Sequence, residues 1–290
     1  MPSLTWLNPA GLTRRTGGTL YNRWVVDGLR ALGWQIDEVP ADRGPMHVEG
    51  LTVVDGLIWP ELEFSGGPVV VLVHSPLFRE RGAPWRERER VALGGADFLV
   101  GTSALSLQDL GVQGEVIPPG AHPAPQSTGA GVLNVGHLIP RKGHDLLLRA
   151  LDLLERPPRV RVAGSAEVHP AHAASLTSDP RVDWLGEVQD LEPEYQRAGL
   201  LVHCADFEGW GMALDEARVR GLEIITTEAG SLERHRDHVR VVERDPQQLA
   251  DAIAAWQDGA RWGRDQPLVP SWEDVAEHWH QWLSERTRRL

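Results

Sequence analysis

The sequence has little cysteine and a shortage of positive charge. A single cysteine, Cys204, among 290 residues excludes an intramolecular disulfide and a zinc site built from cysteines, and fits a reducing compartment. Lys and Arg number 29 against 41 Asp and Glu, which gives a net charge of −12. A nucleic-acid partner is therefore not expected, because phosphate binding requires a basic face.

Long apolar runs and a secretion signal are also missing. The longest apolar run, "VVVLV" at 69–73, is too short to cross a bilayer. The start, "MPSLTWLNPAGL", lacks the basic and apolar regions of a signal peptide. We expect a cytoplasmic protein, with a peripheral contact at the inner face of the membrane left open. The arginine-rich segment 79–90 fits either anionic headgroups or a salt-paired surface helix.

Short apolar runs alternate with helical patterns along the chain, which is typical of parallel sheets covered on both faces. In the first half we predict strands at 3–8, 35–39, 51–59 (with a break at Gly56), 69–74, 97–102 and 114–119, and helices at 18–32, 85–94 and 103–110. In the second half we predict strands at 132–137, 159–165, 182–188, 200–206, 222–230 and 239–242, and helices at 144–154, 169–177, 191–198, 211–220 and 246–257.

A segment rich in Pro, Gly, Ser and Thr interrupts this rhythm and indicates a linker. The predicted fold is α/β, with two doubly wound Rossmann-like domains facing across a cleft. We predict domains at 1–122 and 132–270, a linker at 123–131, and a terminal helix at 271–290 that packs back on the first domain. Ser271 and Asp274 are spaced as a near match to a capping box. Ligands of such sheets bind beyond the carboxyl ends of the strands.

The stretch "DFEGWGMALDEA" at 206–217 follows a predicted strand and opens a helix. Gly209 and Gly211 let the backbone come close to a ligand, and the N–H groups of a helix start favour negative charge. Glu208 and Glu216 would face one space and bind adjacent hydroxyls of a sugar or ribose. The alternative is an ordinary loop followed by a solvated helix.

A second loop, in "VGHLIPRKGHD" at 135–145, places Arg141 and Lys142 just before a helix. Two adjacent cations at a helix start suit a diphosphate, although basic loop residues are often merely solvated. No carboxylate or histidine spacing indicates a metal site.

The first predicted domain offers two weaker signals. Gly17 and Gly18 open its first helix in "GLTRRTGG", which allows close approach of a phosphate or acceptor but equally fits a tight turn. This is not a G-x-G-x-x-G fingerprint, which disfavours an oxidoreductase. His74 ends the buried strand "VVVLVH", where it could orient a substrate or move protons, or be structural.

Several of these stretches resemble retaining glycosyltransferases of the GT-B fold, family 4 (the group 1 family). "EGWGMALDE" is similar to their E-x7-E motif, and "VGHLIPRKGHDLLLRAL" to their diphosphate-binding strand–loop–helix. "TGGTLYNRWVVDGLRALGW" resembles the first glycine loop and helix, while "VDWLGEV", "ITTEAGSLE" and "SWEDVAEHW" occur in the family's order.

The resemblance implies metal-independent transfer of a hexose, without cofactor, from a GDP- or UDP-linked sugar to a glycan, lipid or small molecule. It implies catalytic roles for Glu208, Arg141, Lys142 and His74. The implied donor-binding residues are Gly17, Gly18, Gly136, Val188, Gly209, Trp210, Gly211, Met212 and Glu216.

One departure from the family concerns the diphosphate loop, where many relatives have Arg and this chain has His137. The chain is also short for the family. These features keep open a catalytically degenerate, sugar-nucleotide-binding partner subunit. A sugar-nucleotide epimerase is disfavoured by the E-x7-E stretch. The sequence does not indicate the donor base, the acceptor or the oligomeric state.

Overall fold

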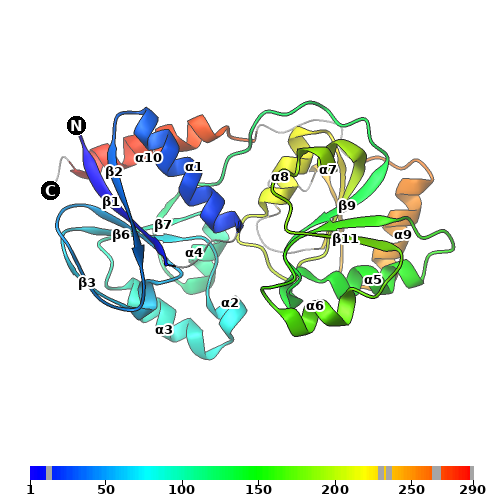
Figure 1. Ribbon diagram of the computed structural model, residues 1–290, viewed down its shortest axis with the longest axis horizontal. Coiled ribbons are helices and arrows are strands. Elements are labelled where there is room, and N and C mark those ends of the chain that lie inside the picture. Colours follow the sequence, from blue (N-terminus) through cyan, green and yellow to red (C-terminus); the bar gives the residue numbers. More distant parts are fainter. Residues whose placement is uncertain (11–14, 228–231, 233–236, 263–268, 288–290) are drawn as a thin grey trace. The chain divides into compact units, whose positions relative to one another are not determined.

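The computed structural model describes residues 1–10, 15–227, 232, 237–262 and 269–287. It divides into two compact units (Figure 1). The first unit comprises Met1–Gly120 and Pro270–Leu290, and the second comprises Ala121–Val269. Each unit is an α/β body built on its own six-stranded sheet, in which all the pairings are parallel.

The sheet of the first unit has the strand order β2-β1-β4-β6-β7-β8. Its strands are β1 (Ser3–Pro9), β2 (Gln35–Ala41), β4 (Thr52–Asp55), β6 (Val69–Val73), β7 (Phe98–Gly101) and β8 (Glu115–Val116). Its helices are α1 (Gly17–Ala31), α2 (Phe78–Arg81), α3 (Pro84–Leu93), α4 (Ala104–Leu110) and α10 (Trp272–Thr287), with a 3₁₀ turn, η1, at Trp59–Glu61. A separate pair joins β3 (Gly44–Val48) and β5 (Leu62–Gly66).

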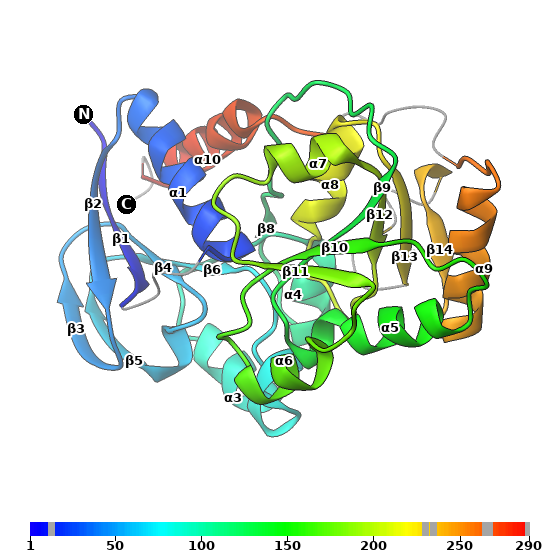
Figure 2. The same cartoon turned by 45° about the vertical axis from the view of Figure 1, so that its right-hand side comes forward.

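Alternation along β1 assigns its neighbouring side chains to different layers. Leu7 belongs to the buried cluster that includes Leu93 of α3 and Leu107 of α4. Trp6 instead packs its ring 5.7 Å from that of Trp279 on α10. Helix α10 lies alongside α1 in both views (Figures 1 and 2). The last helix of the described chain therefore covers the sheet that begins with the first strand.

Helix α10 begins with the capping box that the sequence suggested. The Ser271 N–H donates to Asp274 Oδ2 at 2.9 Å, and the Asp274 N–H donates to Ser271 Oγ at 3.1 Å. The two side chains thus satisfy two backbone donors at the helix start. On the buried side of the helix, Trp279 Nε1 donates to Tyr21 Oη of α1 at 2.8 Å. That hydroxyl donates in turn to the Ile117 carbonyl at 2.8 Å.

The sheet of the second unit has the strand order β11-β10-β9-β12-β13-β14. Its strands are β9 (Gly131–Val135), β10 (Val160–Ala163), β11 (Val182–Gly186), β12 (Ala198–His203), β13 (Glu223–Thr227) and β14 (Arg240–Val242). Its helices are α5 (His144–Asp152), α6 (Pro170–Leu176), α7 (Glu192–Arg197), α8 (Met212–Val219) and α9 (Pro246–Gln257), with a 3₁₀ turn, η2, at Pro140–Lys142.

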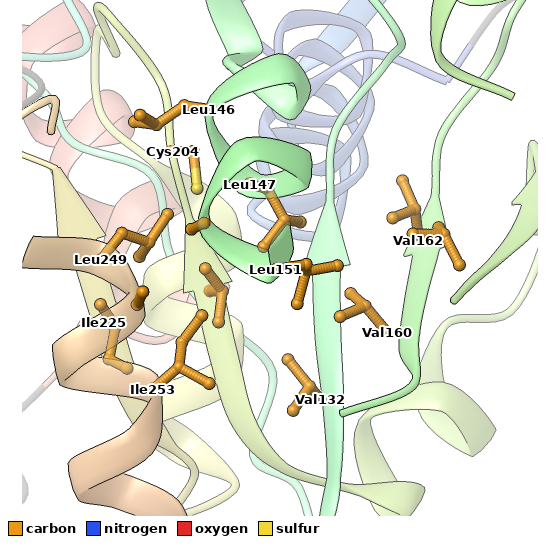
Figure 3. Packing of buried hydrophobic residues seen from close by; sticks show 14 of the residues in the cluster. Val132, Leu146, Leu147, Leu151, Val160, Val162, Cys204, Ile225, Leu249 and Ile253 are labelled. Atoms are coloured by element: carbon orange, nitrogen blue, oxygen red, sulfur yellow. The ribbon is translucent and has the colours of Figure 1, made fainter. Parts of the chain in front are cut away.

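Both faces of this second sheet are buried, again by alternation. Val132 of β9 packs with Leu147 of α5 and Ile253 of α9, as Figure 3 shows. The next residue, Leu133, joins Leu214 of α8 in a cluster on the other face. Cys204 is fully buried in the first of these clusters.

The structure corrects several predicted boundaries. The predicted strand 51–59 ends at Asp55, and Trp59–Glu61 forms η1 instead, because Pro60 favours a helical turn start. The sequence reasoning missed β3 and β5, two five-residue strands in which no side chain is fully buried. The predicted strand 114–119 shortens to β8, because Pro118 and Pro119 cannot donate to a ladder. Residues 228–230 of the predicted strand 222–230 lie outside the described residues, as do residues 11–14 of the first glycine loop.

Each sheet reverses its winding direction once. In the first unit the chain runs from β1 to β2 on one side and then to β4 on the other. In the second unit the corresponding reversal lies between β9 and β12. The carboxyl ends of the strands at such a reversal are the usual ligand site of open α/β sheets. Among the helices that the structure describes, none combines the length and apolar character needed to cross a bilayer.

Candidate active site

The carboxylate of Glu208 lies at the reversal point of the second unit, in the loop between β12 and α8. Its side chain is 11% exposed. Lys142 Nζ contacts Glu208 Oε1 directly. Arg141 Nη1 lies 3.7 Å and His203 Nε2 lies 3.2 Å from the same oxygen. The structure thus brings together the two cations and the first glutamate of the sequence prediction.

The β9–α5 loop and the β12–α8 loop are joined by hydrogen bonds beside this carboxylate. The Asp206 N–H donates to the Arg141 carbonyl at 2.7 Å, and Arg141 Nη1 donates to the Phe207 carbonyl at 2.7 Å. Gly143, with φ +66°, lies against the same segment: a Cβ there would approach the Cys204 carbonyl oxygen to 2.0 Å. The β9–α5 loop and the β12–α8 loop therefore form one polar cradle.

The cradle keeps Glu208 ionised. Burial on its own would raise the pKa of this carboxyl. The charge of Lys142, the hydrogen bond from His203 and the charge of Arg141 outweigh burial and hold the pKa well below its usual range. The site therefore contains a fixed negative charge next to the Lys142 ammonium, which carries three N–H donors.

Two helix starts open at this edge of the sheet. Gly211, with φ +89°, precedes α8, and Gly143 precedes α5. Because both N-cap residues are glycines, neither supplies a side chain that accepts a hydrogen bond from the first turn of its helix. First-turn N–H groups without an intrahelical partner form an anion site in the positive field of the helix dipole. Such a pair of starts suits a diphosphate.

The neighbours of the cradle explain further residues of the motif. Gly136 leaves room for the stem of Lys142, since a Cβ there would lie 3.1 Å from Lys142 Cδ. His137, at the position of the expected arginine, accepts a hydrogen bond from the Ser165 N–H through Nδ1 at 3.1 Å. That histidine therefore has a structural contact in its own unit.

Glu216 lies on α8 next to a different partner. Tyr195 Oη of α7 donates to Glu216 Oε2 at 2.6 Å. Between the two glutamates, Trp210 Nε1 donates to Asp215 Oδ2 at 2.6 Å. Gly209 is buried, Met212 begins α8, and Val188 is partly exposed in the loop after β11.

A second polar cluster lies at the reversal point of the first unit. It consists of Asn8 at the end of β1, Asn22 on α1, Asp55 at the end of β4 and His74 just after β6. His74 Nε2 lies 2.9 Å from Asn22 Oδ1 and 3.4 Å from Asp55 Oδ2. Asn22 Nδ2 donates to Asp55 Oδ2 at 2.7 Å and to Asn8 Oδ1 at 3.0 Å.

The first glycine pair meets this cluster. Thr16 and Thr19 form a reciprocal capping box at the start of α1, which positions Gly17 and Gly18 in the first turn. A Cβ on Gly18 would lie 3.1 Å from His74 Cδ2, so the glycine packs against the imidazole. The structure thus joins Gly18 and His74, which the sequence had presented as separate signals.

Sequence reasoning missed Asn22, Asp55 and His203. A usable signal existed for two of them: Asp55 and His203 each end an apolar strand at the sheet edge where His74 and Glu208 were sought. Burial would raise the pKa of Asp55, but its contacts with His74, Leu57 and Asn22 lower it overall. No group of three or more His, Cys, Asp or Glu able to hold a metal ion occurs in the described part of the chain.

The arginine-rich segment forms salt-paired surface helices. Arg79 Nε lies 2.7 Å from Asp109, and Arg81 Nη1 lies 3.5 Å from Glu61. The guanidinium groups of Arg81 and Arg88 stack over Trp85, at 4.3 and 4.5 Å from the ring centroid.

Comparison with known proteins places the two units in one fold class, GT-B, in which two Rossmann-like domains occur in one chain. Residues 129–258 match the family model described as "Glycosyl transferases group 1". No curated protein matches the sequence significantly.

Three solved structures illustrate the likeness. Sucrose-phosphate synthase from Thermosynechococcus elongatus is 17% identical, with a TM-score of 0.81 and coverage of 100% of both chains. HepE from Anabaena, solved in complex with UDP-glucose, is 16% identical, with a TM-score of 0.72 and coverage of 99% of this chain and 100% of that one. WaaG, a glycosyltransferase of lipopolysaccharide biosynthesis, is 17% identical, with a TM-score of 0.67 and coverage of 96% and 95%.

Proposed function

We propose that this protein is a retaining, metal-independent glycosyltransferase of the family 4 type, which moves a hexose from a UDP- or GDP-linked donor to an acceptor. The observation that carries the proposal is the cradle of Arg141, Lys142 and Glu208 beside two uncapped helix starts. It combines cations for a diphosphate with an ionised acceptor of hydrogen bonds for sugar hydroxyls. The match of residues 129–258 to the group 1 model supports the same assignment.

The proposed roles follow from charge and position. Arg141 and Lys142 stabilise negative charge on the departing nucleotide diphosphate, with help from the N–H groups of Gly211 and Met212. Glu208 and the Gly209–Trp210 backbone hold the sugar while its anomeric carbon gains oxocarbenium character. Because this chain's own cations and helix starts neutralise the diphosphate, the proposed reaction needs no metal ion.

The remaining donor contacts are proposed for residues around the cradle. Glu216 accepts hydrogen bonds from the ribose hydroxyls, and the Tyr195 hydroxyl holds its carboxylate in place. Val188 lies beside the base, and Gly136 leaves space for the lysine stem. In the first unit, Gly17 and Gly18 admit the donor phosphates, and His74 meets the sugar. We expect a hydroxyl-bearing glycan, lipid or small molecule as acceptor.

Nucleotide binding is the first experiment. UDP, GDP, ADP and their glucose or mannose derivatives are added to the protein, and thermal unfolding is followed. A ligand at 100 times its dissociation constant stabilises a protein by about 2.7 kcal/mol, which is an upward shift of several degrees. A shift with one nucleotide family identifies the donor base. No shift with any nucleotide contradicts the proposal, and binding without transfer indicates the catalytically degenerate partner subunit.

Transfer itself is tested with Lys142→Ala. Loss of the ammonium beside the diphosphate should cost about 3–4 kcal/mol of transition-state stabilisation, by analogy with a lost oxyanion donor. The control is Arg149→Ala on α5, whose side chain is 59% exposed and whose Nη2 lies 3.5 Å from the exposed carboxylate of Asp145. Unchanged turnover in a folded Lys142→Ala protein would remove Lys142 from the mechanism. The anomeric configuration of the product, read by NMR, decides between retention and inversion.

A further inference from the structure

His74 is surrounded by a buried carboxylate and a buried amide, those of Asp55 and Asn22. Asp55 is 4% exposed at its side chain, and Asn22 is 2% exposed overall. Burying a carboxylate and an amide is costly unless their hydrogen bonds are satisfied. The two groups hydrogen-bond to each other, and Asn22 in turn contacts Nε2 of the His74 imidazole.

The chemistry of Asp55 fixes the orientation of the Asn22 amide. An ionised carboxylate only accepts hydrogen bonds, so the group 2.7 Å from Asp55 Oδ2 must be the Nδ2 donor of Asn22. The second hydrogen of Nδ2 goes to Asn8 Oδ1 at 3.0 Å. Oδ1 of Asn22 is thereby left facing His74 Nε2 at 2.9 Å.

His74 Nε2 therefore faces acceptors only. Asn22 Oδ1 and Asp55 Oδ2, at 2.9 and 3.4 Å, both require a hydrogen on this nitrogen. The ring has little freedom to turn over, because Gly18 packs against its Cδ2 edge and Tyr21 meets it edge-on at a centroid distance of 5.3 Å. No hydrogen bond to Nδ1 occurs among the described residues, and the side chain is 19% exposed.

We propose that Asp55, acting through Asn22, fixes His74 as its Nε2–H tautomer and so reserves the Nδ1 lone pair for a hydroxyl group of the substrate. Asp55 and Asn22 are then positioning residues, and His74 is the group that touches the ligand. In the neutral imidazole only the nitrogen without hydrogen can accept, so the wrong tautomer would present an N–H to the hydroxyl. The identity of the ligand as a sugar hydroxyl rests on the proposed function, whereas the tautomer does not.

The tautomer is measured directly by ¹⁵N NMR of the imidazoles. The chain has 12 histidines, so the His74 signals are assigned by their absence in a His74→Gln protein. Spectra are recorded near pH 9, where ordinary imidazoles are neutral. We expect Nδ1 to resonate as the nitrogen without hydrogen and Nε2 as the protonated one. The reverse assignment, or a mixture of tautomers in the wild-type protein, overturns the proposal.

Asp55→Asn tests whether the carboxylate of Asp55 sets the tautomer of His74, because asparagine has almost the same shape as aspartate. The Leu57 N–H donates to Asp55 Oδ1 at 2.9 Å, so the variant keeps its carbonyl there and turns an NH₂ group toward Asn22. Two donors then face each other, and turning the Asn22 amide to relieve this contact presents its NH₂ to His74. We expect the Nδ1–H tautomer to appear. A tautomer that stays entirely Nε2–H in a folded variant overturns the role of Asp55.

The matched control is Asp27→Asn on the same helix as Asn22, where the side chain is 59% exposed and lies 3.8 Å from Arg23 and 3.9 Å from Arg30. This control should leave the His74 spectrum unchanged. Transfer by Asp55→Asn should fall about 10²-fold in kcat. UDP binding should change less than about twofold, since His74 is proposed to meet the donor sugar and UDP carries none.

Ligand titration separates this inference from the proposed function. Saturating UDP-glucose or GDP-mannose should shift the Nδ1 resonance of His74 and leave Nε2 nearly in place. A shift centred on Nε2 overturns the assignment of Nδ1 to the ligand. If neither sugar nucleotide binds, the proposed function fails, and the tautomer in the ligand-free protein and in Asp55→Asn still decides the positioning role.

Discussion

Lys142→Met is the substitution whose effect on stability the structure defines most sharply. Glu208 is 11% and Lys142 18% exposed at their side chains. Removing one partner of a buried pair costs about 3–5 kcal/mol, because the remaining charge is left without compensation. Arg141 at 3.7 Å and His203 at 3.2 Å remain beside the carboxylate. We therefore expect a loss of about 2–3 kcal/mol in the unfolding free energy of the second unit.

A double-mutant cycle with Glu208→Gln isolates the pair, since glutamine carries no charge. Urea denaturation of the wild-type protein, both single variants and the double variant at pH 7 should give a coupling energy of about 2 kcal/mol. Lys142→Met should cost little in the Glu208→Gln protein. Equal costs of Lys142→Met in both backgrounds would refute the reasoning, because the methionine would then act through packing alone.

The pH dependence gives an independent check with a defined sign. The pKa of Glu208 is lowered in the folded protein. Its contribution is therefore fully present above the unfolded carboxyl pKa of about 4.3 and is lost as pH falls through the folded value. Lys142→Met raises the folded pKa, so the stability gap to the wild type should narrow on acidification, by at most about 1.4 kcal/mol per pH unit.

Other predictions concern backbone strain, a buried hydrogen bond and a buried histidine. Gly143→Ala should destabilise the protein by more than about 2 kcal/mol in urea, because its Cβ would meet a backbone carbonyl oxygen at 2.0 Å, whereas Gly33→Ala, also at positive φ but in open space, should cost only about 1 kcal/mol. Trp279→Phe removes the donor to Tyr21 and should cost about 1–2 kcal/mol by the same assay; no loss would mean that the hydroxyl is satisfied without it. Burial, followed by the charge of Lys142, lowers the pKa of His144 to about 3. The unfolded chain, in which a histidine has a pKa of about 6.5, therefore binds a proton first, so the free energy of unfolding falls as the pH drops from about 6.5 to about 3. His144→Leu should reduce this fall. An unchanged pH dependence of the unfolding free energy in that variant would show that His144 is not its cause.

The fold class was predictable because short apolar runs typical of buried strands alternate with segments of helical periodicity along the sequence. Apolar runs such as Val69–Val73 fit a strand buried on both faces, and 246–257 coincides with α9 because Asp245 caps it and Pro246 begins it. The β3–β5 pair was missed because each strand is only five residues long, contains glycine, and has no fully buried side chain, so its alternation of partly buried and exposed residues is a weak signal. The strand 51–59 was overestimated because the apolar residues Ile58 and Trp59 bury their side chains from a 3₁₀ turn.

Some residues of the candidate site were likewise predictable from the sequence, and others were not. Loop residues next to glycines, such as Glu208 and Lys142, were identifiable from local spacing. Asn22 was not, because it meets Asp55 only through pairing of β1 with β4 and packing of α1, across 33 positions of sequence. The position of Asp55 at the end of an apolar strand was a usable signal, but it did not indicate Asn22 as the partner. The contact between a buried amide and the carboxylate that it binds has no local sequence signature and is visible only in the tertiary structure.

The discontinuous first unit has a consequence for biosynthesis. On the ribosome, β1 to β8 emerge first, but α10 appears only after the whole of Ala121–Val269 has been made. Until then Trp6 and Tyr21 lack the cover that Trp279 provides. The nascent chain therefore exposes an apolar face of the first unit throughout the synthesis of the second unit, and the first unit is completed only after α10 has been made.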